Sequence, residues 1–422
     1  MAQTKVKSEL IEGGLGTDWQ STIQTSNFTA EAGKGYFANT TSSGITVTLP
    51  SSPSLGDEIS IADYTGTFNT NPLTLNPNGN KIRGGTTAKV LNANNKAVKL
   101  VFTDSTEGWV VAGSASNDDL GAATYSLDAL IVAGGGGAAQ GAGNGGGGAG
   151  GLLTGTIANQ ASNVQYTITI GAGGAISNGG YHTAGNDGSN SSIAIAGGST
   201  HTSNGGGRGG AGTSTATANP GGSGGGGGGA TINGTNTNGA ASNQTNSTPL
   251  TGHGNAGGNG TGYNDYIGAG GGGAGASGGV PSGSYPNIQA GHGGVGLTST
   301  IISTTNATNE SVGEVSGGAV YFAGGGGGAA YTAAHIGNGG LGGGADGNYS
   351  TNNGNSGAVN TGGGGAGTQY GTQGTGGAGG SGVVILKMPT ASYSSNITGS
   401  PSVVTEGTNT ILVYKSSGTY TT

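Results

Sequence analysis

The chain holds 422 residues, of which 103 are glycine and only 7% are charged, with a formal net charge of −7 and no cysteine. An ordinary soluble domain has about 7% glycine and about 25% charged residues. The acidic balance argues against nucleic acid as a partner, and the lack of cysteine excludes a disulfide framework and thiolate metal sites. Neither a signal peptide nor a membrane-spanning helix is expected, because the first ten residues are polar and long apolar runs are missing.

The first stretch, residues 1–25, is predicted to be an attachment segment. It mixes polar and charged residues with a few apolar ones, and glycines from residue 13 onward stop any helix early. A leading segment of this kind is expected to dock onto another structure. Its candidate contact residues are Leu10, Ile11 and Trp19.

Residues 26–113 are predicted to form a small antiparallel β module. Apolar and polar residues alternate from Ile45 to Leu49 and again around Val98 and Leu100, as expected for half-buried strands. Turn residues separate these runs at spacings typical of a small sandwich or barrel. Residues 114–124 are predicted to be a linker.

Residues 125–388 form the glycine-rich body, in which about a third of residues 134–382 are glycine. Apolar strands are predicted at both of its ends, over Leu127–Ala133 and Val383–Met388, and we expect them to pair and close its base. Residues 389–422 return to β-type sequence as a C-terminal β segment, with Thr410–Tyr414 as its clearest strand.

The glycine runs allow several interpretations. Collagen is excluded because proline is rare and runs such as Gly224–Gly229 break a triplet repeat. A flexible linker and silk-like β-stacking remain alternatives, but linkers are rich in serine and charge and lack apolar anchors. We favour an ordered array, because glycine segments without side chains can approach closely enough to hydrogen-bond through their backbones.

Specific motifs resemble those of known phage proteins. The stretches 130–137 (LIVAGGGG), 167–174 (TITIGAGG) and 379–386 (GGSGVVIL) resemble the glycine-rich domains of bacteriophage tail-fibre proteins. The stretch 33–37 (GKGYF), with the alternating run and the GD and DYTGTF motifs that follow it, resembles a small β module of marine phage tail fibres.

The body also looks like the adhesins at the fibre tips of T-even-like phages. That resemblance implies a polyglycine II helix sandwich bracketed by β-strands, beside an all-β N-terminal module and with little or no α-helix. It also implies a virion tail fibre that attaches to the tail or to other fibre proteins through its N-terminus, forms a homotrimer, and binds a host receptor, a polysaccharide or an outer-membrane protein. Those adhesins are separate tip subunits, whereas this chain carries its own N-terminal module and C-terminal tail, so the end that faces the host stays open.

Receptor contact is expected from the connectors between glycine runs, because loops on a rigid scaffold carry recognition. Tyrosine offers a large rigid contact surface with a polar tip. The alternative for each tyrosine is that it packs over the glycine array as an apolar cap. The candidate receptor-binding residues are Tyr181, His182, Tyr263, Tyr266, Tyr285, Tyr331, His335, Tyr349 and Tyr370.

No catalytic, metal or cofactor site is expected. Matches to nucleotide-binding glycine motifs arise by chance at this glycine content, the five histidines lack ligand spacing, and Glu310 and Glu314 have no further catalytic residues beside them. The protein is therefore predicted to bind without catalysis. The alternative function is an ice-binding or extracellular structural protein, although the irregular connectors favour adhesion.

Overall fold

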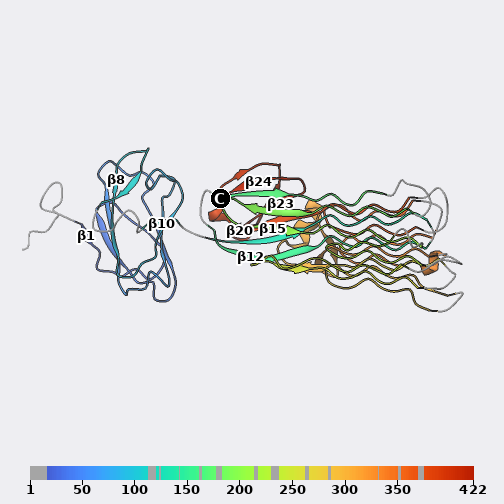
Figure 1. Ribbon diagram of the computed structural model, residues 1–422. Coiled ribbons are helices and arrows are strands. Elements are labelled where there is room, and N and C mark those ends of the chain that lie inside the picture. Colours follow the sequence, from blue (N-terminus) through green and yellow to red (C-terminus); the bar gives the residue numbers. More distant parts are fainter. Residues whose placement is uncertain are drawn as a thin grey trace, which may run out of the picture. The chain divides into compact units, whose positions relative to one another are not determined.

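The computed structural model describes residues 17–112, 120–122, 125–141, 143–160, 164–176, 183–212, 217–229, 237–261, 266–283, 287–330, 332–349, 353–368 and 375–422. The described chain is almost entirely β structure with one short α-helix, so the predicted all-β class with little helix is confirmed. No helix in these ranges is long and apolar enough to cross a bilayer. The chain divides into two compact units, residues 1–124 and 125–422 (Figure 1).

The first unit is a sandwich of two five-stranded sheets. One sheet has the order β1-β3-β5-β8-β9 and the other β10-β7-β6-β4-β2. Their facing side chains form one core around Phe68 and Trp109, both fully buried. The strands are β1 (Asp18–Trp19), β2 (Phe28–Thr29), β3 (Lys34–Ala38), β4 (Ile45–Thr48), β5 (Glu58–Asp63), β6 (Leu73–Asn76), β7 (Lys89–Leu91), β8 (Ala97–Phe102), β9 (Trp109–Val111) and β10 (Leu120–Ala122).

The prediction of an antiparallel module is wrong for half of this sandwich. The pairs β1–β3, β3–β5, β2–β4 and β4–β6 are all parallel. From β2 to β6 the chain alternates between the two sheets, so each strand returns to its own sheet in the same direction after crossing through the other. The alternation of apolar and polar residues indicates which face of a strand is buried. It does not indicate whether the strand runs parallel or antiparallel to its neighbours.

The first unit includes parts of two segments that were predicted to lie outside the β module, the attachment segment 1–25 and the linker 114–124. Within the predicted attachment segment, β1 pairs with β3, and Gln20 and Gln24 donate backbone hydrogen bonds to Gly35 and Phe37. Within the predicted linker, β10 pairs with β7. The described parts of both segments therefore add strands to the sandwich.

The second unit begins with two stacked sheets. A six-stranded sheet has the order β16-β12-β11-β20-β23-β22, and a five-stranded sheet has the order β15-β14-β13-β24-β21. A shared core that includes Tyr166, Tyr414 and Tyr420 joins them. The strands are β11 (Tyr125–Val132), β12 (Leu152–Gln160), β13 (Gln165–Thr169), β14 (Ser191–Ile195), β15 (Thr200–Ser203), β16 (Thr251–His253), β20 (Val383–Pro389), β21 (Asn396–Ile397), β22 (Ser402–Glu406), β23 (Asn409–Tyr414) and β24 (Gly418–Thr421).

The expected pairing of the two bracketing strands is confirmed. β11 and β20 are antiparallel neighbours in the six-stranded sheet, from Asp128 opposite Lys387 to Val132 opposite Val383. The C-terminal segment 389–422 also forms strands, and these complete both sheets, because β23 pairs with β20 and β24 pairs with β13. Apolar burial between these strands fixes the places where the glycine runs start and end.

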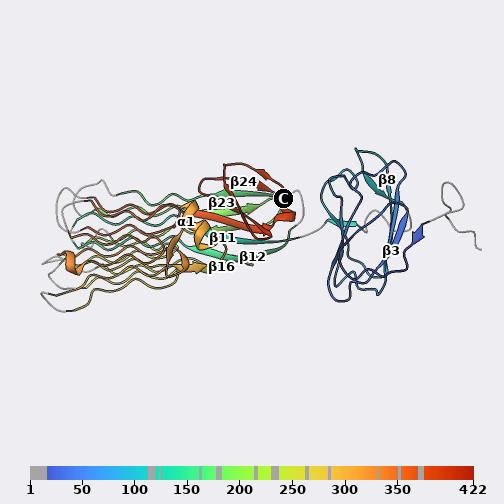
Figure 2. The same cartoon turned by 180° about the vertical axis from the view of Figure 1, so that it is seen from behind.

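A small cover lies on the outer face of the six-stranded sheet (Figure 2). It consists of β17 (Leu297–Ser299), α1 (Thr304–Glu310), β18 (Glu314–Ser316) and β19 (Ala319–Phe322). The helix begins at its N-cap Ser303, whose side chain accepts the amide of Asn306. At its other end, Lys415 reaches the Glu310 carboxylate at 3.2 Å.

The remaining described residues of 133–151, 171–190, 204–296 and 323–382, apart from strands, form what we call the glycine array. Its extended segments run side by side away from the two sheets (Figures 1 and 2). Segment 144–151 lies inside the array, and its amides donate in rotation to three different segments, with N···O distances of 2.8–3.0 Å. The donor–acceptor pairs are Gly145–Gly210, Gly148–Gly207 and Gly151–Asn204 for the first, Gly146–Ala269 and Ala149–Gly272 for the second, and Gly147–Gly365 and Gly150–Gly362 for the third.

The carbonyl groups of the same segment accept from three further segments. Those segments contribute the amides of Gly226 and Ser223, of Gly326 and Ala329, and of Gly136 and Ala133. Segment 144–151 is therefore surrounded by six neighbours, and the pattern repeats every third residue. This backbone network confirms the predicted ordered array.

Close approach explains why these positions are glycine. A Cβ added to Gly147 would lie inside van der Waals contact of the Gly136 carbonyl, and one added to Gly146 would meet the Gly326 carbonyl in the same way. Both obstacles are backbone atoms, which cannot turn aside as a flexible side chain can.

We expect Gly147→Ala to destabilise the second unit by about 3 kcal/mol, because the methyl group forces apart segments that hydrogen-bond directly. The matched control is Gly198→Ala in the β14–β15 turn, where the nearest atoms belong to the Ile195 side chain at 3.3 Å. That change should stay within about 1 kcal/mol. Thermal unfolding followed by circular dichroism measures both, and equal melting temperatures would contradict the packing argument.

Candidate functional site

The glycine array turns back on itself at the end of the second unit that lies away from the sheets. We call this the distal end, and it includes the 3-10 helix η3 (Ala333–His335), the short orange coil at that end in Figure 1. Its other described residues include Gly141 and Thr368, which the Asn144 side chain joins, Gly143 and Tyr266, which lie next to each other, and Tyr349, whose neighbour Asn348 donates to Gly367. Backbone bonds join its parts, including one of 2.8 Å from Gly229 to Gly143. Described segments that are far apart in the sequence therefore reach this end together.

Three of the predicted receptor-binding residues lie at the distal end within the described chain. Tyr266 is partly buried, with a positive φ of 52°, next to Gly143. His335 places Nδ1 3.1 Å from the Thr332 hydroxyl. Tyr349 is 50% exposed. The other candidates lie outside the described residues: Tyr181, His182, Tyr263, Tyr285, Tyr331 and Tyr370.

A buried asparagine that the sequence did not single out holds two segments together at this end. Asn144 is fully buried, and its side-chain amide donates to the carbonyls of Gly141 at 2.7 Å and Thr368 at 3.0 Å. Nearby, Ile267, Ile288, Ala290, Ala330 and Ile336 form a small apolar cluster. These contacts hold the described segments together at the distal end.

Along the edges of the array, side-chain oxygens accept backbone amides that have no neighbouring segment to bond to. The carboxylate of Asp187 accepts the amide of Arg208 at 2.8 Å, and Asn190, three residues later, accepts that of Gly205 at 2.8 Å. The same spacing recurs where Asn353 and Ser356 accept the amides of Thr375 and Ala378, at 3.0 and 3.3 Å. Polar residues spaced three apart beside a glycine run are thus a sequence pattern that indicates a segment at the edge of the array.

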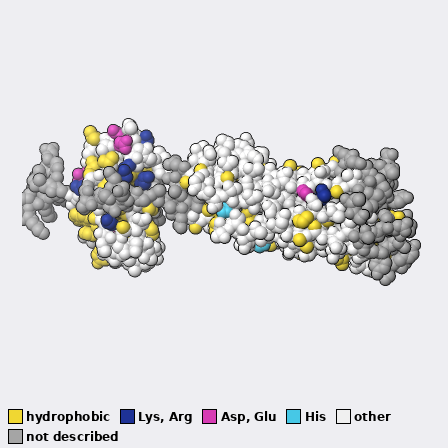
Figure 3. All heavy atoms as spheres, viewed as in Figure 1, with side chains coloured by type: hydrophobic (Ala, Val, Ile, Leu, Met, Phe, Trp, Pro, Cys, Tyr) yellow, Lys and Arg dark blue, Asp and Glu magenta, His cyan; other side chains and the backbone are white. Residues whose placement is uncertain are grey.

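The visible face of the second unit carries few charged side chains, in contrast to the first unit (Figure 3). Within the described chain, no cluster of three or more histidine or acidic residues could hold a metal ion. The two glutamates considered as a catalytic pair are engaged separately. Glu310 pairs with Lys415, and Glu314 accepts the amides of Gly342 and Gly343 at 2.7 and 2.9 Å.

The described part of the predicted attachment segment exposes an aromatic pair. Trp19 on β1 stacks on Phe37 of β3 with ring centroids 4.6 Å apart, and these side chains are 43% and 36% exposed. The neighbouring Asp18 pairs with Lys34 at 2.6 Å. The other two candidates, Leu10 and Ile11, lie outside the described residues.

Two family models match the chain. Residues 111–389, more than half of the chain, match a family described as "Glycine-rich domain". Residues 13–118 match "Bacteriophage T4 gp9/10-like protein, N-terminal". The shorter match lies within the first unit, and the longer match covers most of the second unit but ends before its strands β21–β24. No curated protein matches the chain.

Two histidines on the strands of the second unit give it an expected pH dependence. Burial lowers the pKa of His201, whose Nδ1 lies 2.9 Å from the Ser247 hydroxyl, and also that of His253. The unfolded chain then binds more protons than the folded chain just below the ordinary histidine pKa of about 6.5. Their contribution to stability is complete above that pH and is lost as the pH falls toward their folded pKa values.

We therefore expect the melting temperature of the second unit to fall between about pH 7.5 and pH 5. His201→Gln should flatten that slope, because glutamine can still hydrogen-bond Ser247 but does not titrate. His335→Gln at the distal end is the control. The prediction fails if the slope of melting temperature against pH is the same in the wild type and in His201→Gln.

Proposed function

The chain belongs to the glycine-rich domain family, and from this premise we propose that it is a tail fibre whose distal end binds a host-cell receptor. The match of the first unit supports a phage tail-associated protein and thus a virion component. In the proposed arrangement, the first unit attaches to the tail or to another fibre protein. The receptor is a polysaccharide or an outer-membrane protein of the host.

The observation that carries this proposal is that described array segments distant in sequence reach one common end of the second unit (Figure 1). Tyr266 lies next to Gly143, the His335 carbonyl accepts the Ala290 amide, and Tyr349 follows Asn348, which donates to Gly367. These three candidates come from segments distant in sequence and lie at the distal end. The six remaining candidates lie outside the described residues. Recognition commonly resides in loops held by such a scaffold, because the scaffold limits the entropy lost on binding.

We further propose that the array segments are polyglycine II helices. Their hydrogen bonds rotate through three directions every three residues, which is the repeat of the extended helix that polyproline and collagen chains adopt. A bundle of such helices is stiff without a large apolar core. Binding proceeds without catalysis, and a homotrimer, which the resemblance to fibre adhesins implies, would raise weak single contacts to useful avidity.

Purified protein should compete with the phage for adsorption to host cells. Tyr349→Ala should weaken this competition by about tenfold, because exposed tyrosines at binding surfaces often contribute strongly to affinity. The matched control is Tyr64→Ala on the first unit, since Tyr64 is 53% exposed and Tyr349 is 50% exposed.

The control should compete as well as the wild type. Wild-type protein that neither binds host cells nor slows adsorption would refute receptor binding by this chain. Equal competition by the two variants would instead remove Tyr349 from the contact surface.

Attachment should depend on the exposed aromatic pair of the first unit. Trp19→Ala removes the ring that stacks on Phe37, and we expect at least a fivefold lower amount of the protein in purified virions, as for an aromatic hot spot. Leu55→Ala is the control, because Leu55 is 81% exposed on the same unit. Quantitative mass spectrometry of the particles measures both, and normal incorporation of Trp19→Ala would contradict this role.

A further inference from the structure

On the outer face of the six-stranded sheet, the side chains change from apolar to polar where the cover ends. Under the cover, Leu130 of β11 and Ile385 of β20 are fully buried. Two residues away on the same face of each strand stand Asp128, which is exposed, and Lys387, which is partly buried. On β12 the same change leads from buried Leu152 to Thr154 and Thr156.

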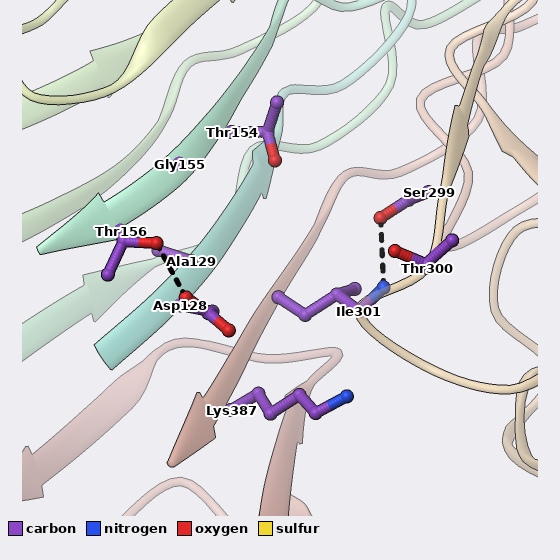
Figure 4. Close-up of a pocket in the computed structure, with 9 residues that line it drawn as sticks. All are labelled: Asp128, Ala129, Thr154, Gly155, Thr156, Ser299, Thr300, Ile301 and Lys387. Carbon is purple, nitrogen blue, oxygen red and sulfur yellow. Dashed lines mark hydrogen bonds between the residues drawn. The ribbon is translucent and has the colours of Figure 1, made fainter. Parts of the chain in front are cut away.

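This polar end of the face forms one side of a pocket of about 260 Å³ (Figure 4). The loop after β17 forms the other side. The lining residues that carry functional groups are Asp128, Thr154, Thr156, Ser299, Thr300 and Lys387. The pocket thus combines a carboxylate, an ammonium group and four hydroxyl groups.

The two charged groups are placed as partners and yet do not pair. Asp128 and Lys387 are directly opposite each other on neighbouring strands, but among the described residues no ion pair within 4.0 Å involves either of them. One carboxylate oxygen of Asp128 accepts the Thr156 hydroxyl at 2.7 Å. Lys387 attracts the Glu406 carboxylate electrostatically but forms no ion pair with it within 4.0 Å. The second oxygen of Asp128 and the Lys387 ammonium can therefore still reach a ligand.

The loop wall of the pocket is held in place from behind. Ile301 is 8% exposed and belongs to the core under the cover. Two residues further, the Ser303 amide donates to the Glu406 carboxylate at 2.9 Å, and the Asn306 side chain donates to the same oxygen at 2.6 Å. A pocket whose walls are fixed before binding loses little entropy when it is filled.

We propose that this pocket binds a sugar acid, a small ligand with one carboxylate and several hydroxyl groups. The ligand carboxylate would accept hydrogen bonds from Lys387, and a ligand hydroxyl would donate to the free oxygen of Asp128. The threonine and serine hydroxyls can donate or accept, as a polyhydroxylated ring requires. The site shares no residue with the distal end and does not depend on the function proposed for it.

Two alternatives to a sugar acid must be separated from it: an amino acid as the ligand, and a pocket that binds no ligand. A zwitterionic amino acid would satisfy both charges but leave most of the four hydroxyls unused. If the charges serve only to keep an exposed sheet face soluble, the pocket has no ligand, and the pair contributes little to stability.

Isothermal titration of the full chain with D-glucuronate, D-glucose and L-serine separates these cases. We expect glucuronate to bind with a dissociation constant of about 1 mM or below, and glucose and serine to bind at least tenfold more weakly. No binding of glucuronate, or equal or tighter binding of glucose or serine, would overturn the proposal.

Variants then locate the site. Lys387→Met and Asp128→Asn should each weaken glucuronate binding about tenfold with a nearly unchanged melting temperature. Arg208→Met, which removes a cation from the glycine array, is the matched control and should bind as the wild type does. Retained binding in Lys387→Met would overturn the assignment, whereas competition for host adsorption by that variant should equal the wild type whichever result is found.

Discussion

The backbone hydrogen bond between neighbouring glycine segments is the interaction on which the second unit depends. Segment 144–151 meets six neighbours through its own amides and carbonyls, and a Cβ added to glycines such as Gly146 and Gly147 would meet the backbone of a neighbouring segment. Single bonds contribute only about 0.5–1.5 kcal/mol, while glycine loses more conformational entropy on folding than other residues. The array is therefore stable only as a cooperative whole in which nearly every segment has its neighbours.

Glycine segments cannot select their own partners, and the stacked sheets supply that selection. The strands β11, β12, β13, β14 and β20 lead directly into or out of array segments, and their apolar side chains define which strand lies beside which. Side-chain oxygens such as those of Asp187 and Asn190 then close the edges of the array by accepting amides that have no backbone partner. The same contacts leave fewer free donors for pairing with another molecule.

In the second unit, the glycine array forms the framework, while the larger polar and aromatic side chains of the proposed sites lie at its two ends. The body of the array offers backbone and small side chains, and both of the binding sites that we propose lie at its ends. At the distal end, Asn144 joins described residues that are far apart in the sequence, Gly141 and Thr368. At the other end, the sheet face beyond the cover places Asp128 and Lys387 around a pocket.

The sequence by itself determined the local elements and the class of the fold. Alternation predicted β4 and β8, apolar runs predicted that β11 and β20 pair, and the missing side chains of the glycine runs predicted a backbone-bonded array. Strand direction in the first unit, the neighbours of each glycine segment and the pocket between Asp128 and Lys387 were decided by the tertiary structure alone. The physical reason is that the pattern of apolar and polar residues indicates which side chains are buried. Glycine has no side chain, so a glycine run does not specify which segment it will lie beside.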